Sequence, residues 1–364
     1  MLIKTSKESI KHALEYLVKI PFAKEALHRI TESARGKCIA FFSIHRVLAD
    51  APESLFHPHY IHKTAITERQ AVKHLRYINQ KLPFISLVDS LEFLLGKRPL
   101  DRSHAVLLIE NAYVETVRHI SPFLIEHKIP AAIALNTQSI EDGRMPWIDE
   151  IIFRLGQTAV KNLSLNFMDR SFQLRSIPER LQASHHIIHY LSQSSPEIIQ
   201  ARSKEICDQL SEVALPPTSE RICTLHQLEK LSLNPLFSFM CAGRNRLPLA
   251  TMSRAEAHKE LMTAKSDLNA CLSRGVLPIY FSQFAFDKKG HQEFSKFMQD
   301  DGYQAAISPK VGLARPGDNM FRLKRLPLAQ GLSSFEQFEL QGLSDAIDEM
   351  LLVTLGREDR QENS

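Results

Sequence analysis

Short runs of consecutive hydrophobic residues alternate along the chain with segments whose hydrophobic residues recur at helical spacing. The continuous runs lie at 38–44, 84–87, 105–109, 131–136, 237–240, 277–281 and 303–308. Runs of this length are typical of strands buried on both faces, as in parallel sheets. The amphipathic segments predict helices at 67–80, 88–95, 114–127 and 253–273. Capping-box patterns that begin at Thr67, Thr224 and Ser253 mark three helix starts.

This alternation predicts an α/β protein built as a (β/α) barrel of about seven strands, distorted or incomplete. We expect the barrel domain to span 38–330. The polar segment 156–220, rich in Ser, Gln and His, interrupts the alternation and predicts a helical insertion. Helical spacing predicts an N-terminal helical lead-in over 1–37, and a C-terminal helix with a charged tail over 331–364.

Composition narrows the class of protein. Among 364 residues, 45 Lys and Arg are interleaved with 41 Asp and Glu, for a net charge of +4, without the long basic block typical of nucleic-acid binding. We therefore expect no nucleic-acid partner. No run of about 18 apolar residues predicts a membrane span, and no export signal is apparent, so we expect a cytoplasmic location. The five scattered cysteines predict reduced thiols rather than a disulfide framework.

The stretch HAVLLIENAYVET, residues 104–116, holds the first candidate chemistry. A buried strand ends at Glu110 and Asn111, and Tyr113 follows before the next helix. The carboxyl ends of barrel strands commonly carry active-site residues. The residues alone leave three interpretations open: an active site, the remains of one, or an ordinary strand-to-helix turn. His45 follows the first strand and is either a ligand or proton-transfer group, or a histidine that caps the strand end.

Other histidines form patterns that resemble metal sites. His57, His59 and His62 cluster in HPHYIH, but no carboxylate lies at ligand spacing, so we predict a surface loop. His185 and His189 lie four residues apart, a spacing that can bind zinc. Because no HExxH pattern accompanies them, we predict a polar helix face. Phosphate-binding glycine motifs and the GxSxG motif of serine hydrolases are absent from the sequence.

Several segments together resemble the bacterial polysaccharide deacetylases, in order and in spacing. They are FFSIHRV (41–47), the stretch 104–136, WIDEII (147–152), SFMCAGRNR (238–246) and the stretch 300–328. The resemblance covers most of 38–330 outside the insertion, and it implies the barrel fold of that family. Family members are thought to deacetylate N-acetyl sugars. They use a divalent metal held by one aspartate and two histidines, with a second aspartate as base.

The chain departs from the family at every metal position. The resemblance places Glu110 at the base, Asn111 at the metal aspartate, and Ala242 and Arg246 at the two metal histidines. An amide, a methyl group and a guanidinium are poor ligands for a cation that must activate water. We expect no metal at this site and no cofactor, and a divalent metal only if its ligands come from outside the family motifs. An ion pair between Arg246 and Glu110 is expected instead.

The leading expectation for function is a polysaccharide-deacetylase-like protein of bacterial cell-surface carbohydrate metabolism, acting for example on exopolysaccharide. It would be non-catalytic or strongly altered and would bind a glycan through Arg246, Asn111 and Tyr113. The first alternative is a hydrolase that deacetylates N-acetyl sugars with Glu110 as base and His45 as acid. The second is an interaction scaffold that binds a protein partner through 156–220.

Overall fold

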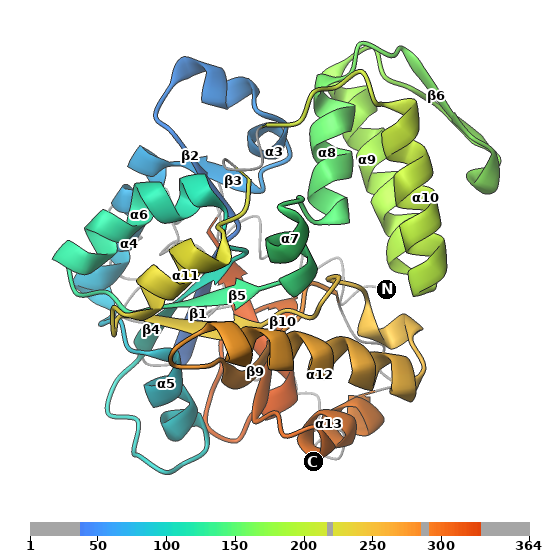
Figure 1. Cartoon of the computed structure of the whole chain (residues 1–364). Coiled ribbons are helices and arrows are strands. Elements are labelled where there is room, and N and C mark those ends of the chain that lie inside the picture. The colour runs from blue at the N-terminus through green and yellow to red at the C-terminus, as the bar shows by residue number, and fades with distance from the viewer. Residues whose placement is uncertain (1–36, 217–220, 285–290, 329–364) are drawn as a thin grey trace, which may run out of the picture.

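The computed structural model describes residues 37–216, 221–284 and 291–328 (Figure 1). The helices predicted within 8–36 and 335–354 lie outside the described residues. Within the described part, no helix combines the length and apolar character that crossing a bilayer requires.

Seven parallel strands close into a barrel at the centre of the molecule (Figure 1). In their order around the barrel they are β1 (Ile39–Ile44), β11 (Leu323–Pro327), β10 (Ala305–Val311), β9 (Leu277–Phe281), β8 (Phe237–Cys241), β5 (Ala131–Leu135) and β4 (His104–Glu110). Pairing of β1 with both β11 and β4 closes the ring. The predicted (β/α) barrel is confirmed. It is closed, and its distortion lies in register shifts between β8 and β9 and between β10 and β11.

One predicted barrel strand is wrong, and one was missed. The run 84–87 makes only an isolated bridge, from Phe84 to Ala105. Its Ser86 side chain instead accepts a hydrogen bond from Asp89 N and begins helix α5 (Leu87–Leu94). The strand that the sequence did not predict is β11, whose hydrophobic run is broken by Lys324 and Arg325.

The strands are buried on both faces, as their continuous hydrophobic runs predict. Along β1, Ile39 and Phe41 join the cluster that fills the barrel interior. Ala40, Phe42 and Ile44 join the larger cluster that packs beneath the surrounding helices. This alternation follows from the period-two side-chain direction of a strand. It leaves the carboxyl ends of the strands as the natural place for polar residues.

Helices surround the barrel (Figure 1). They are α4 (Glu68–Lys81), α5, α6 (Val114–Glu126), α7 (Thr137–Asp142), α11 (Leu225–Ser232), α12 (Arg254–Cys271) and α13 (His291–Asp300). Short elements follow β1: β2 (Arg46–Leu48), η1 (Pro52–Phe56), α3 (Pro58–Ile61) and β3 (Ala65–Thr67), with β2 and β3 paired. The capping boxes predicted at Thr67, Thr224 and Ser253 are confirmed, with both hydrogen bonds present in each.

A second group of helices stands beside the barrel (Figure 1). Helices α8 (Trp147–Gln157), α9 (Ile177–Ser192) and α10 (Pro196–Gln209) pack around their own hydrophobic cluster. The hairpin of β6 (Asn162–Leu165) and β7 (Arg170–Gln173) extends from this group and was not predicted. Helix α8 also contacts α3, so it joins the helical group to the barrel.

Candidate functional site

Five charged or titratable residues meet at the carboxyl end of the barrel, and we call them the ionic cluster. His45 follows β1, Glu110 ends β4, Arg325 lies in β11, Arg246 follows β8, and Asp149 lies in the first turn of α8. Four of the five are almost fully buried, and the His45 side chain is 13% exposed. They come from distant parts of the sequence because parallel barrel strands bring their carboxyl ends to the same side.

His45 bridges the two carboxylates of this cluster. Its Nε2 lies 3.0 Å from Asp149 Oδ1, and its Nδ1 lies 3.4 Å from Glu110 Oε2. The guanidinium groups complete the cluster: Arg325 Nε lies 3.3 Å from Glu110 Oε1. Arg246 lies 3.7 Å from Glu110 Oε2 and 3.8 Å from Asp149 Oδ2. The ion pair that the sequence predicts between Arg246 and Glu110 is therefore present.

The cluster fixes the charge of its members. Burial alone would raise the pKa of Glu110, but Arg325, His45 and Arg246 hold it well below its usual range. Burial acts in the same direction on Asp149, whose pKa His45 and Arg246 likewise lower. Burial would lower the pKa of His45, yet the two carboxylates raise it to about 9. At neutral pH the cluster therefore holds two carboxylates and an imidazolium.

Asn111 and Tyr113 both hold Asp149. The Tyr113 hydroxyl donates to Asp149 Oδ2 at 2.6 Å, and Asn111 Nδ2 donates to the same oxygen at 3.5 Å. Asn111 has left-handed backbone, with φ of 68°. Both side chains are buried, so their predicted contact with a glycan stays a prediction. Sequence reasoning missed Asp149. Its signal was weak, since it stands among the hydrophobic residues of WIDEII.

His59 overturns another expectation. The prediction of a surface loop for His57, His59 and His62 is wrong, because His59 is fully buried and the other two are half-buried. Nitrogens of His45 and His59 and an oxygen of Asp149 all lie within 4.8 Å of one another. The prediction was wrong because no carboxylate lies near HPHYIH in the sequence, whereas in the fold Asp149 of α8 lies beside His59.

His185 and His189 are exposed on α9, as predicted. The His185 ring lies against His62, with ring centroids 6.1 Å apart. Burial, together with His185, lowers the pKa of His62 to about 4. Between about pH 4 and pH 6.5, His62 is therefore mostly neutral in the folded state and mostly protonated in the unfolded chain.

Acid is expected to destabilise the fold through His62. A folded-state pKa below the unfolded value of 6.5 leaves this contribution intact above pH 6.5 and removes it as the pH falls towards 4. In urea unfolding at pH 7.5 and pH 4.5, His62→Gln should lose less stability between the two pH values than the unmodified protein. His189→Gln serves as the matched exposed control and should follow the unmodified protein. An equal decline for all three proteins would contradict this prediction.

The residues at the family's metal positions do not fit a divalent metal. Asn111 offers only a neutral amide oxygen in place of a carboxylate, Ala242 is buried without a donor atom, and Arg246 carries a positive charge. A divalent cation at these positions would meet a guanidinium where the family has an imidazole.

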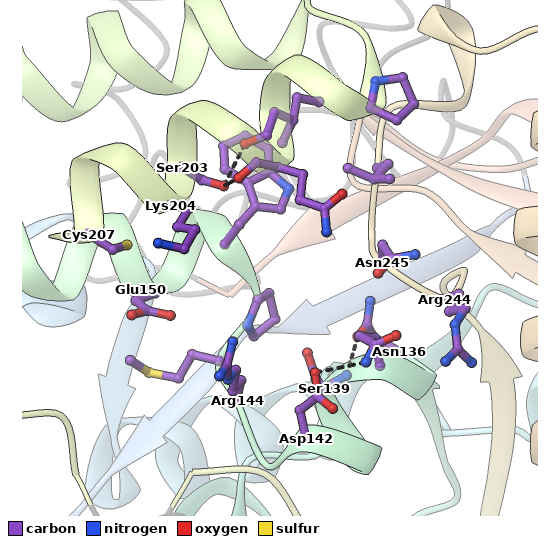
Figure 2. A pocket seen from close by; sticks show the side chains of 18 of the residues that line it. Asn136, Ser139, Asp142, Arg144, Glu150, Ser203, Lys204, Cys207, Arg244 and Asn245 are labelled. Carbon is purple, nitrogen blue, oxygen red and sulfur yellow. Dashed lines mark hydrogen bonds between the residues drawn. The ribbon is translucent and has the colours of Figure 1, made fainter. Parts of the chain in front are cut away.

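A large cleft lies beside the ionic cluster, between α7, α8, α10, α12 and the loop after β8 (Figure 2). Its volume is about 1120 Å³. Most of the residues that line it are polar or carry a charge of either sign, while apolar atoms make up more of its exposed wall than polar atoms do. The labelled lining residues of Figure 2 include amides, carboxylates, guanidinium groups, hydroxyls and an ammonium group: Asn136, Ser139, Asp142, Arg144, Glu150, Ser203, Lys204, Arg244 and Asn245.

Two short segments join the cleft to the ionic cluster. Asn245 and Leu247 line the cleft, while Arg246 between them belongs to the cluster. Trp147 lines the cleft and donates its indole N–H to Arg246 O at 3.4 Å. Asp149, two residues further along α8, belongs to the cluster. Glu150, the residue after Asp149, also lines the cleft, so on both segments a cleft residue directly neighbours a cluster residue in the sequence.

Comparison with known proteins gives a fold likeness alone. No protein-family model matches the sequence, and no curated protein does. The solved structures that are similar to this chain include two with TM-scores above 0.5. One is the Streptococcus pyogenes deacetylase PplD in complex with acetate, at 11% identity and a TM-score of 0.54, with 84% of this chain and 98% of that chain covered. The other is IcaB from Ammonifex degensii, at 13% identity and a TM-score of 0.51, with 84% and 97% covered. The resemblance to the polysaccharide deacetylases is thereby confirmed at the level of the fold, a closed barrel of seven parallel strands.

Proposed function

We propose that this protein is a polysaccharide-deacetylase-like carbohydrate-binding protein of bacterial cell-surface metabolism whose hydrolytic centre has been replaced by the ionic cluster. The observation that carries the proposal is the buried guanidinium of Arg246. It lies within 3.8 Å of both Glu110 and Asp149, at a position where the family resemblance places a metal-binding histidine. At this position the positive charge is the guanidinium of Arg246 rather than a metal ion.

The same cluster makes Glu110 a poor general base. A base for neutral pH needs a pKa near that pH, whereas Arg325, His45 and Arg246 hold the pKa of Glu110 far below it. Two guanidinium groups and an imidazole also surround its carboxylate oxygens. These contacts argue against the alternative in which Glu110 and His45 hydrolyse an N-acetyl sugar.

The cleft is the proposed sugar site. Its amide, hydroxyl, carboxylate and guanidinium groups supply both donors and acceptors, as a ligand covered with hydroxyl groups requires. Trp147 adds an aromatic surface, held in place by its N–H hydrogen bond to Arg246 O and by Phe284, whose ring plane lies 5° from that of the indole. The volume of about 1120 Å³ exceeds the ~300–1,000 Å³ of typical small-molecule sites, which favours an oligosaccharide.

Short oligosaccharides of N-acetylglucosamine are expected to bind in the cleft and raise the melting temperature. A ligand that binds only the native state adds stability, about 2.7 kcal/mol at a concentration of 100 times its Kd. Trp147→Ala and Gln200→Ala, which change cleft residues on α8 and on α10, should weaken binding in isothermal titration calorimetry. Phe56→Ala removes an aromatic ring that is 72% exposed and outside the cleft, and it should bind like the unmodified protein.

The same mixtures of protein and oligosaccharide, also assayed for acetate, distinguish carbohydrate binding from the hydrolase and from the scaffold. Release of acetate from the oligosaccharide, abolished by Glu110→Gln, would replace this proposal with the hydrolase. Neither stabilisation nor turnover, for N-acetylated and de-N-acetylated oligosaccharides alike, would contradict carbohydrate binding. That result would favour the scaffold, in which 156–220 binds a protein partner.

A further inference from the structure

We propose that His45, His59 and Asp149 form a binding site for a divalent transition-metal ion such as Zn²⁺, separate from the metal positions of the family resemblance. The three candidate ligand atoms lie within 4.8 Å of one another. Two imidazoles and one carboxylate are a ligand set that suits zinc. The inference does not rest on carbohydrate binding.

His59 supplies the clearest observation. The Thr64 hydroxyl donates to His59 O at 3.1 Å, so its oxygen accepts a hydrogen bond from His59 Nδ1, also at 3.1 Å. This contact fixes the proton on Nδ1 and leaves a bare lone pair on Nε2. Within the described part of the chain, Nε2 is buried and has no hydrogen-bond partner.

An unpartnered buried acceptor of this kind costs about 1–3 kcal/mol in other proteins unless something binds it. His59 is therefore better explained as an acceptor whose cation is supplied from solution. The other two ligands already face the same space, because His45 Nε2 lies 3.0 Å from Asp149 Oδ1. Zinc bonds of about 2.0–2.1 Å place neighbouring ligand atoms about 3.3 Å apart, so a small inward movement of His59 completes the set.

The opposite atom of each ligand is held by another residue, as is typical of metal sites. His45 Nδ1 lies 3.4 Å from Glu110 Oε2 and can keep its proton there, while a bound ion would displace the proton that Nε2 shares with Asp149 Oδ1. Asp149 Oδ2 accepts from Tyr113 and lies 3.8 Å from Arg246, which leaves Oδ1 towards His45. Thr64 plays this part for His59. The guanidinium of Arg246 thus approaches Asp149 on the oxygen opposite to the one that faces His45.

The experiment measures metal rather than activity. Full-length protein stripped with a chelator is titrated with Zn²⁺ by calorimetry, and with Co²⁺ as a spectroscopic probe of coordination. We expect one tightly bound ion and the visible bands of tetrahedral cobalt. His59→Gln and Asp149→Asn, each removing one ligand, should lose these bands. Thr64→Val should weaken Zn²⁺ binding by about 10–100-fold, because it leaves all three ligands in place and removes the two hydroxyl hydrogen bonds that orient His59.

His189→Ala is the matched control, since it removes an exposed histidine outside the site. It should bind one ion with the same affinity and the same cobalt bands. Equal binding by the control and by Thr64→Val, or a cobalt spectrum without tetrahedral bands in the unmodified protein, would overturn the proposal. If His59→Gln fails to fold, the unmodified protein and Thr64→Val, with its folding checked by circular dichroism, still decide the question.

Discussion

Arg325→Met is expected to lower the free energy of unfolding by about 3–5 kcal/mol, the usual cost of removing one partner from a buried ion pair. The Arg325 side chain is buried; its guanidinium donates to Ser282 O at 2.7 Å and lies 3.3 Å from Glu110. Methionine fills similar volume, so the loss reports charge rather than a cavity. Glu110 would keep its negative charge in a buried site with fewer cations around it.

Two further variants isolate the electrostatic part of this loss. Glu110→Gln combined with Arg325→Met should recover part of the lost stability, because the uncompensated carboxylate is gone. Arg98→Met is the surface control: Arg98 also lies near two carboxylates, Asp89 and Glu92, but its side chain is 51% exposed. It should cost less than about 1 kcal/mol. Urea unfolding of all four proteins gives the comparison, and equal losses for Arg325 and Arg98 would contradict a buried role for the cluster.

Gly156→Ala is expected to lower the free energy of unfolding by about 1–3 kcal/mol, the usual cost of inserting a methyl group into a packed contact. A Cβ atom at Gly156 would lie 2.5 Å from Pro58 Cβ and 2.6 Å from Pro58 Cγ, so α3 would have to move away from α8. This cost exceeds the gain of up to about 1 kcal/mol that alanine brings to a helix interior.

The displacement has a second readout. Pro58 precedes His59, and Gly156 lies on the same helix as Asp149, so moving α3 from α8 should separate two proposed zinc ligands. Zinc affinity in Gly156→Ala should fall together with stability. Combining the change with Pro58→Gly removes the clashing Cβ and Cγ atoms and should restore the helix contact. A Gly156→Ala protein that is more stable than the unmodified one would show that α3 and α8 do not pack this closely.

Local sequence patterns predicted most of the barrel. Runs such as 105–109 can be buried on both faces only as interior strands, and the capping boxes name the atoms that begin a helix. The strand predicted at 84–87 is wrong because the Ser86 hydroxyl accepts a hydrogen bond from the backbone N–H of Asp89 and begins helix α5 instead. Strand β11 escaped notice because Arg325 lies within it, and only the fold shows that Glu110 makes a buried arginine acceptable there.

The candidate site was predictable in part. Glu110 and His45 stand directly at strand ends, where position along the chain already implies position in the barrel. Asp149 and His59 do not stand at strand ends. They become neighbours only because α8 and α3 pack together. Spacing along a sequence identifies ligand sets that one segment carries. It does not identify a set assembled from three segments.

Helix α8 is enclosed on every side except where it lines the cleft. Of its eleven residues only Gln157 is exposed, since the cleft, the ionic cluster, α3 and the hydrophobic cluster of the second helical group each occupy a side. Mutations along α8 should therefore depend strongly on one another, and a homologue that changes one of these surroundings should show compensating changes in the helix. In a saturation mutagenesis screen, α8 should be among the least tolerant helices of the chain.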